Sequence, residues 1–113
     1  MASLFGEYIK ERLDKDIIED HRGFATYYFI DDGCYVEDIF VKKQYRNQDV
    51  AKEMLNKISN IARERNIYKL IGTAIPSVKG GCTDSLQAAF SYGFKVDSAA
   101  SNLIVYVKDL GAK

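Results

Sequence analysis

The stretch that decides the fold is YVEDIFVKKQYRNQDVAKEML, residues 35–55. It begins with an apolar, β-branched run typical of a strand, continues through a basic, turn-like segment, and enters a helical pattern at Asp49. Two adjacent acids, Glu37 and Asp38, interrupt the apolar run. Because a charged side chain inside a buried strand costs free energy unless it is solvated or paired, the stretch also marks a candidate functional site.

Hydrophobic spacing predicts the elements on either side of this stretch. The predicted elements are a helix near 3–14, a strand at 24–30, a turn at 31–33, a strand at 34–41, a helix at 49–65, a strand at 68–75, a helix near 84–92 that ends at Gly93, and two closing strands, FKVDSAAS and NLIVYVKDL. Residues 15–23 are ambiguous, although Ile17 and Ile18 could form a short strand.

The order of these elements predicts the fold class. A central strand, helix and strand imply a parallel crossover connection, whereas the hairpins on both sides imply antiparallel pairs. We therefore expect an α/β protein of the α+β type. It would have a mixed, mostly antiparallel sheet, a central parallel crossover and helices on both faces, in a single domain over residues 1–113.

Composition argues against several classes of function. Sixteen basic residues balance sixteen acidic ones, so no net field favours nucleic acid or an anionic membrane. No apolar run is long enough to span a bilayer, and residues 1–13 have a helical pattern rather than that of a signal peptide. We expect a cytoplasmic protein in which Cys34 and Cys82 are free thiols. One histidine and no Cys/His cluster predict no metal site.

The segment around the start of the central helix allows two interpretations. The amides of a helix's first turn and its dipole favour an anion, and Lys42, Lys43 and Arg46 would add positive charge there. Ala51 would let a phosphate approach the backbone. In the alternative, Asp49 is an ordinary N-cap beside surface lysines, and the residues alone favour this second interpretation.

The acidic pair also has two interpretations, which carry equal weight from the residues alone. Successive strand residues point to opposite faces, so we expect at most one of Glu37 and Asp38 to point into any given cavity. In the first interpretation the strand has one solvated face that carries an acid. In the second the pair lies beside a cleft, attracts a cationic amine and supplies a general base.

At this point the sequence resembles a known family. RNQDVA, residues 46–51, is similar to the Arg/Gln-x-x-Gly-x-Gly/Ala motif of the GCN5-related N-acetyltransferase (GNAT) superfamily. The run VEDIFVKKQYRNQDVAKEML resembles that family's strand, pyrophosphate loop and helix, particularly in the polyamine acetyltransferase type. SLQAAFSYGF and NLIVYVKDL resemble its last helix and closing strands, so the likeness covers about residues 24–110.

The resemblance implies an acetyl-CoA-dependent N-acetyltransferase that acts on a primary amine of a small molecule, a lysine or a protein N-terminus. The backbone of Ile39, Phe40 and Val41 would bind the pantetheine arm where two parallel strands splay apart. Glu37, with Asp38, would contact the acceptor amine and take its proton. The residues implied at the pyrophosphate are Arg46, Asn47, Gln48, Asp49, Val50, Ala51 and Lys52.

Three departures from the family pattern define an alternative. Asp49 replaces the first glycine of the loop, Ala89 stands where many members have a tyrosine general acid, and the N-terminal region is short. The alternative is a catalytically degenerate GNAT fold that serves as a binding or structural component. It would be virion-associated if the chain is phage-encoded, since similar compact chains occur in tailed-phage genomes. The resemblance is compatible with a homodimer.

Overall fold

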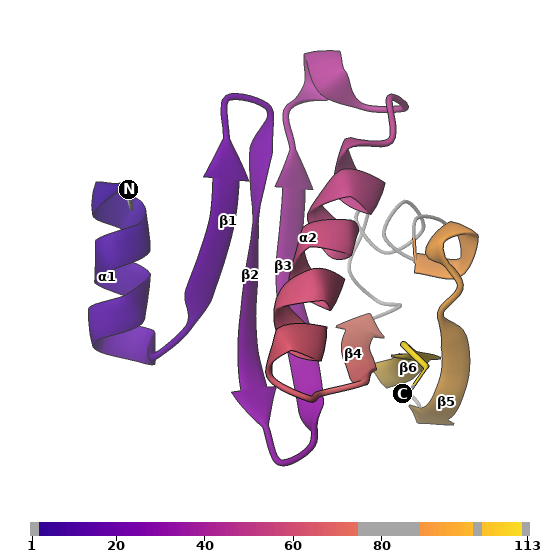
Figure 1. Ribbon diagram of the computed structural model, residues 1–113. Helices are drawn as coiled ribbons and strands as arrows, with labels where there is room; N and C mark the ends of the chain where they lie inside the picture. Colours follow the sequence, from indigo (N-terminus) through magenta and orange to yellow (C-terminus); the bar gives the residue numbers. More distant parts are fainter. Residues whose placement is uncertain (1–2, 75–88, 101–102, 112–113) are drawn as a thin grey trace.

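The computed structural model describes residues 3–74, 89–100 and 103–111 (Figure 1). Its elements are α1 (Leu4–Leu13), β1 (Asp16–Asp20), β2 (Gly23–Ile30), β3 (Gly33–Val41), the short 3-10 helix η1 (Lys43–Tyr45), α2 (Val50–Glu64), β4 (Lys69–Ala74), β5 (Lys95–Ala100) and β6 (Leu103–Asp109). The ambiguous residues 15–23 contain the strand β1, which pairs with β2 along its whole length. The other boundaries of the elements named here differ from the predicted ones by one or two residues.

The described strands form one sheet in the order β1-β2-β3-β4-β6-β5. Among them β3 and β4 run parallel, joined by α2, and the other neighbouring pairs are antiparallel. Along β2, Ala25 and Tyr27 join the core beneath α2, whereas Phe24 turns to the other face and contacts Phe5 of α1. The helices therefore cover opposite faces, and the predicted fold class is confirmed.

The core lies between α2 and the sheet, and Figure 1 shows α2 crossing in front of β3. α2 is strongly amphipathic, because Val50, Met54 and Ile58 recur at helical spacing and are at most 3% exposed. They pack against the inward side chains of β2 and β3, including the buried thiol of Cys34. This packing fixes the start of α2 just beyond the end of β3.

The predicted helix near 84–92 is described only in its last turn. Residues 89–92 are helical, and the helix ends at Gly93, whose φ of 113° lies where glycine is favoured. The amide of Gly93 donates to the carbonyls of Ala89 and Phe90, which closes the turn. The predicted start of this helix lies outside the described residues, as does Cys82. No helix in the described part of the chain is long and apolar enough to cross a membrane.

Arg22 ties the β1–β2 turn to α2. Its guanidinium donates to Asp20 and to Glu53, both at 2.8 Å. The hydrogen bonds that the guanidinium and the backbone amide of Arg22 donate to Asp20 lower the pKa of Asp20 from 3.8 to about 2. An acid whose pKa is lower in the folded protein stabilises the fold at pH values above its ordinary pKa and loses that contribution as the pH falls.

We therefore expect Arg22 to change the acid sensitivity of the fold. The stability that Asp20 contributes should be complete above about pH 4 and lost between about pH 4 and pH 2. Arg22→Ala should make the loss of stability across this window shallower, as measured by urea unfolding at several pH values. Arg12→Ala, at an exposed arginine beside Glu11, is the matched control and should keep the wild-type slope.

Candidate functional site

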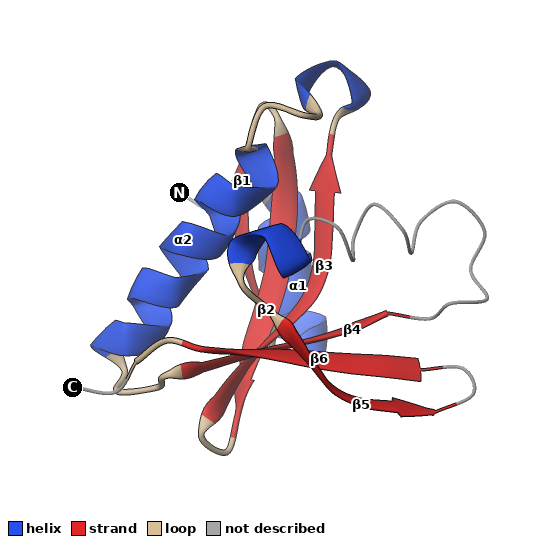
Figure 2. Ribbon diagram, turned by 90° about the vertical axis from the view of Figure 1, so that its right-hand side faces the viewer, coloured by secondary structure: helices blue, strands red, loops and turns tan. Residues whose placement is uncertain are grey.

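The parallel strands β3 and β4 separate soon after they meet. Their pairing is limited to Cys34 with Leu70 and Tyr35 with Ile71. Figure 2 shows β3 running up the view while β4 runs across it. From Val36 to Val41, β3 keeps β2 as its ladder partner on one side, and no described strand pairs with its other edge. Backbone amide and carbonyl groups on that edge can therefore form hydrogen bonds with a bound molecule.

Arg46 covers one end of this edge. Its Nε donates to the carbonyl oxygen of Val41 at 2.9 Å, and its guanidinium carbon lies 5.8 Å from the centre of the Phe40 ring. The side chain therefore folds back onto the strand, while the rest of the loop continues toward α2. The half-buried Ile39 lies one residue further back, opposite Ala25 of β2.

The loop before α2 has an unusual backbone. Asn47 and Asp49 have φ values of 64° and 61°, in the left-handed region that asparagine and aspartate tolerate better than most residues. Between them, the side-chain amide of Gln48 donates to the carbonyl of Gln44 at 3.1 Å. The turn brings the chain to Val50, which is buried. The loop thus adopts a conformation that suits glycine without containing one.

Asp49 is the N-cap residue of α2, as one interpretation of the sequence predicted, but its side chain does not cap the helix. Its carboxylate makes no capping hydrogen bond. N-cap residues normally have an extended backbone that directs the side chain back to the first turn, and the left-handed φ prevents this. The carboxylate is 78% exposed and lies 3.8 Å from the ammonium of Lys52. The amides of the first turn of α2, at Val50, Ala51 and Lys52, therefore carry no side-chain cap.

The acidic pair lies at a β-bulge. Val36 stands opposite Tyr27 and Asp38 stands opposite Thr26, so Glu37 is an extra residue in β3. The bulge breaks the strict alternation on which the expected opposite faces of Glu37 and Asp38 depend. Both acids interact electrostatically with the same lysine, Lys15.

The surroundings of the pair favour a cation. Glu37 forms an ion pair with Lys15, and this hydrogen bond raises the pKa of the lysine. Burial raises the pKa of Asp38, and the charge of the neighbouring Glu37 raises it further. The Lys15 ammonium also lies 5.5 Å from the centre of the Tyr28 ring. Tyr28 stacks on Tyr35 with 5.1 Å between the ring centres.

Lys15 is a site residue that the sequence pattern does not indicate. It lies 22 residues before Glu37 in the chain, in the connection between α1 and β1. Its only local signal is its position at the end of a predicted helix, where lysines are common. The contact depends on how β1, β2 and β3 pair, so spacing along the sequence could not have indicated it.

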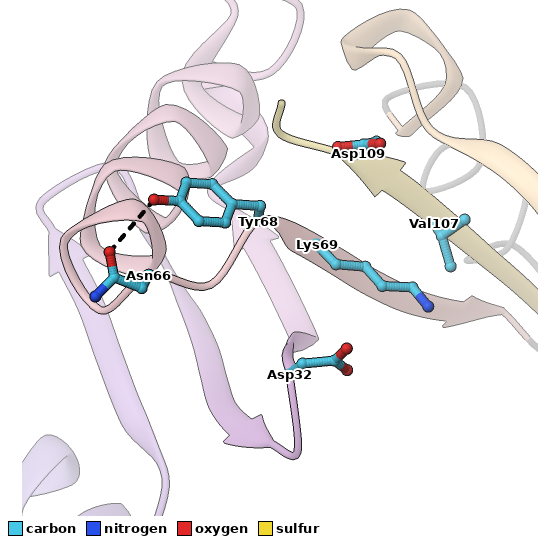
Figure 3. A pocket seen from close by; sticks show the side chains of 6 residues that line it. All are labelled: Asp32, Asn66, Tyr68, Lys69, Val107 and Asp109. Carbon is cyan, nitrogen blue, oxygen red and sulfur yellow. Dashed lines mark hydrogen bonds between the residues drawn. The ribbon is translucent and has the colours of Figure 1, made fainter. Parts of the chain in front are cut away.

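Of two surface pockets, one lies beside the acidic pair and Lys15. Figure 3 shows a pocket of about 440 Å³ between β4, β6 and the β2–β3 turn; its lining residues are Asp32, Asn66, Tyr68, Lys69, Val107 and Asp109. None of them is a predicted site residue. A second pocket of about 360 Å³ is lined in part by Lys15 and Tyr28. The second pocket therefore adjoins the acidic pair, and we consider it the relevant one.

Other residues considered in the sequence have structural roles. Tyr92 hydrogen-bonds to Asn56 at 2.7 Å and to Ser59 at 3.0 Å, both on α2. Ala89 is buried. Burial raises the pKa of the Cys34 thiol to about 12, so this cysteine is unreactive at neutral pH. In the described part of the chain, no three histidine, cysteine, aspartate or glutamate side chains gather as a metal site would require.

Comparisons with known proteins agree with this arrangement. Residues 13–79 match the family model described as the acetyltransferase (GNAT) family. A search of curated protein sequences gives no significant match.

Solved structures give many matches of low sequence identity. PaiA N-acetyltransferase from Thermoplasma acidophilum, solved in complex with coenzyme A, is 17% identical with a TM-score of 0.74, covering 94% of this chain and 69% of its own. A GNAT family acetyltransferase from Elizabethkingia anophelis, solved with acetyl-CoA bound, is 17% identical and has a TM-score of 0.71. The match covers 92% of this chain and 82% of that protein. The ribosomal-protein-S18-alanine N-acetyltransferase from Escherichia coli is 13% identical and has a TM-score of 0.67. The match covers 88% of this chain and 71% of that protein. At these identities the likeness establishes the fold.

Proposed function

The chain belongs to the acetyltransferase (GNAT) family, and on that premise we propose that it transfers the acetyl group of acetyl-CoA to a primary amine. Two of the solved structures that it resembles contain coenzyme A or acetyl-CoA. The observation that carries the proposal is the separation of β3 from β4 directly beside the bulge at Glu37. A strand edge that can hold a cosubstrate thus adjoins a carboxylate that can hold an amine.

The residues around this edge fit acetyl-CoA. The edge of β3 at Ile39, Phe40 and Val41 has no second ladder partner among the described strands, so its backbone groups suit the amide-containing pantetheine arm. The first amides of α2 carry no side-chain cap and suit the pyrophosphate, because a helix N-terminus attracts anions. The residues proposed to contact the phosphates are Arg46, Asn47, Gln48, Asp49, Val50, Ala51 and Lys52.

Glu37 is the proposed general base. When bound, acetyl-CoA supplies a thioester whose carbonyl carbon can be attacked by an amine. An acceptor amine is protonated in neutral solution and must lose a proton before it can act as a nucleophile. Glu37 would hold the ammonium and accept this proton, directly or through a water molecule. Asp38, beside it, adds negative charge that draws the cation toward the bulge, as electrostatic complementarity does for charged substrates.

Calorimetric titration with acetyl-CoA tests the proposal directly. We expect saturable binding with a dissociation constant in the range of roughly 1 μM to 1 mM, as is common for enzyme substrates. Release of free CoA on addition of primary amines would then show transfer. A protein that gives neither heat nor a thermal shift with acetyl-CoA would contradict the enzyme assignment and favour the binding or structural alternative.

Asp49→Gly is expected to bind acetyl-CoA about fivefold more tightly than the wild type. The substitution removes a negative charge beside the proposed phosphate site, and two unit charges about 4 Å apart in water interact by about 1 kcal/mol. It also places glycine at a φ of 61°, where glycine has no steric cost. Calorimetry gives the affinity, and urea unfolding gives the stability.

Asn47→Gly is the matched control for Asp49→Gly. Asn47 has nearly the same left-handed φ, 64°, but carries no charge. Asn47 is proposed to contact the phosphates through its backbone, which glycine keeps, so the affinity for acetyl-CoA should stay almost unchanged. The effect of glycine on stability at a left-handed φ should be similar in the two variants. Unchanged or weaker affinity in Asp49→Gly would show that the charge at this position does not act on the phosphates.

A further inference from the structure

Lys15 reaches the acidic pair from outside the sheet. It follows Asp14, whose left-handed φ of 54° ends α1 and turns the chain toward β1. The lysine ammonium forms an ion pair with Glu37 and lies over the face of Tyr28. The Lys15 side chain is only 21% exposed, much less than that of a typical surface lysine. An alkylammonium group of the chain itself therefore occupies the place where the proposed function puts the amine of the acceptor.

The groups around this ammonium form a subsite with more than one kind of contact. Glu37 supplies a direct ion pair, and Asp38 adds a second negative charge nearby. The face of Tyr28 supplies a cation–π contact. Tyr28 is held by stacking on Tyr35, whose hydroxyl donates to Thr73 on β4 at 2.9 Å. The stacked rings of Tyr28 and Tyr35 are thus held in place by a hydrogen bond between β3 and β4.

A buried hydroxyl beside the acids also points to a ligand. Thr26 stands opposite Asp38 in the ladder between β2 and β3 and is 4% exposed. Its Oγ1 has no hydrogen-bond partner among the described residues. A buried polar group without a partner costs about 1–3 kcal/mol, so such groups in folded proteins usually bind water or a ligand.

The pocket of about 360 Å³ extends the subsite away from the acids. Lys15, Tyr28, Leu13 and Phe29 line it, and its other lining side chains are charged: Lys10, Asp14, Asp16 and Arg65. The Lys15 side chain both lines this pocket and pairs with Glu37. Because Lys15 is itself an unbranched alkylammonium group, the subsite beside Glu37 fits a ligand of that form.

We propose that Lys15 is an internal ligand of the acceptor subsite, and that the acceptor is a primary amine on an unbranched methylene chain that displaces it. The proposal rests on the proposed function insofar as Glu37 contacts the acceptor. A lysine side chain and a linear diamine both have this form. The α-amine of a protein N-terminus is attached to a branched carbon and does not. Because Lys15 is tethered, it competes at a high effective concentration and weakens the affinity for a free amine.

The test measures the binding of butylammonium chloride to the whole chain by calorimetry, without acetyl-CoA. We expect Lys15→Ala to bind butylammonium about tenfold more tightly than the wild type, a difference of about 1.4 kcal/mol. Lys15→Met removes the charge but keeps an unbranched side chain at this position. Its affinity for butylammonium should therefore rise much less. Lys57→Ala is the control, because Lys57 is an exposed lysine of α2 that does not line this pocket, and its affinity for butylammonium should equal that of the wild type.

A second measurement uses the wild-type protein and does not depend on the folding of a variant. Saturating butylammonium should release Lys15 from Glu37, which would shift the Lys15 Cε resonance in a carbon NMR spectrum. The resonance of Lys57 should stay in place. tert-Butylammonium, which has the same charge on a branched carbon, should produce a much smaller shift.

Several results would overturn the inference. Two concern the affinity for butylammonium: equal affinity in the wild type and Lys15→Ala, or an equal rise in affinity in Lys15→Met and Lys15→Ala. The other two are a Lys15 resonance that does not shift at saturating butylammonium, and tert-butylammonium that binds as tightly as butylammonium. Parallel titration with acetyl-CoA separates this inference from the proposed function. If acetyl-CoA binds but Lys15→Ala has no higher affinity for butylammonium than the wild type, the inference about Lys15 fails and the proposed function stands. If Lys15→Ala binds butylammonium more tightly but acetyl-CoA does not bind, the amine subsite stands and the proposal of acetyl transfer fails.

Discussion

Replacement of Glu37 by glutamine is expected to lower the turnover of acetyl transfer by about 100-fold or more, while the affinity for acetyl-CoA stays unchanged. General acid–base catalysis typically contributes about 10²–10⁴-fold to the rate. Glutamine keeps the size and one oxygen of the side chain but cannot accept the proton of an ammonium ion. The proposed contacts to acetyl-CoA come from the backbone of β3 and the start of α2, so the substitution does not touch them.

The measurement is the rate of CoA release at saturating acetyl-CoA and amine, combined with calorimetry of acetyl-CoA binding. Saturating amine is needed because Glu37 also helps to hold the acceptor. Glu64→Gln, at an exposed acid in the last turn of α2, is the control and should keep full turnover. Full turnover in Glu37→Gln would exclude Glu37 as the base, and Asp38→Asn would then test the neighbouring acid.

Much of the fold could be predicted because its strongest elements are locally consistent. The stripe of Val50, Met54 and Ile58 has the helical period, and these residues are among the least exposed in the described chain. The aromatic run of β2 and the turn after it predict a hairpin, which is present. β1 is short and half polar, so its pattern alone could not identify it, and its pairing with β2 decides its structure.

The candidate site was harder to predict, because it depends on irregular backbone and on long-range pairing. Strict alternation predicts opposite faces for Glu37 and Asp38, but one extra residue in the ladder interrupts the alternation at this pair. Asp49 is the N-cap residue of α2, but with its left-handed φ its carboxylate makes no capping hydrogen bond. The sequence did carry a signal here, since asparagine and aspartate at positions 47 and 49 are the residues that best tolerate that conformation.

Gly23→Ala is expected to destabilise the fold by about 3 kcal/mol and to weaken acetyl-CoA binding in the protein that still folds. A Cβ at position 23 would lie 2.0 Å from the carbonyl oxygen of Phe40 and 2.9 Å from the Cα of Val41. Both neighbours are backbone atoms, so β2 and β3 must move apart, and overpacking of this kind costs about 1–3 kcal/mol or more. The displaced segment is the strand edge proposed to hold the pantetheine arm.

Gly33→Ala separates this effect from a general cost of adding a methyl group to the hairpin. Gly33 lies at the other end of the β2–β3 ladder, and an added Cβ there would lie 2.7 Å from the Cδ1 atom of Ile71. The end of an isoleucine side chain can rotate away, so we expect a cost of about 1 kcal/mol and unchanged acetyl-CoA affinity. Urea unfolding and calorimetry of both variants provide the comparison. If Gly23→Ala folds with wild-type affinity, the edge at Phe40 and Val41 does not hold the cosubstrate, because a shift of that backbone would then leave binding intact.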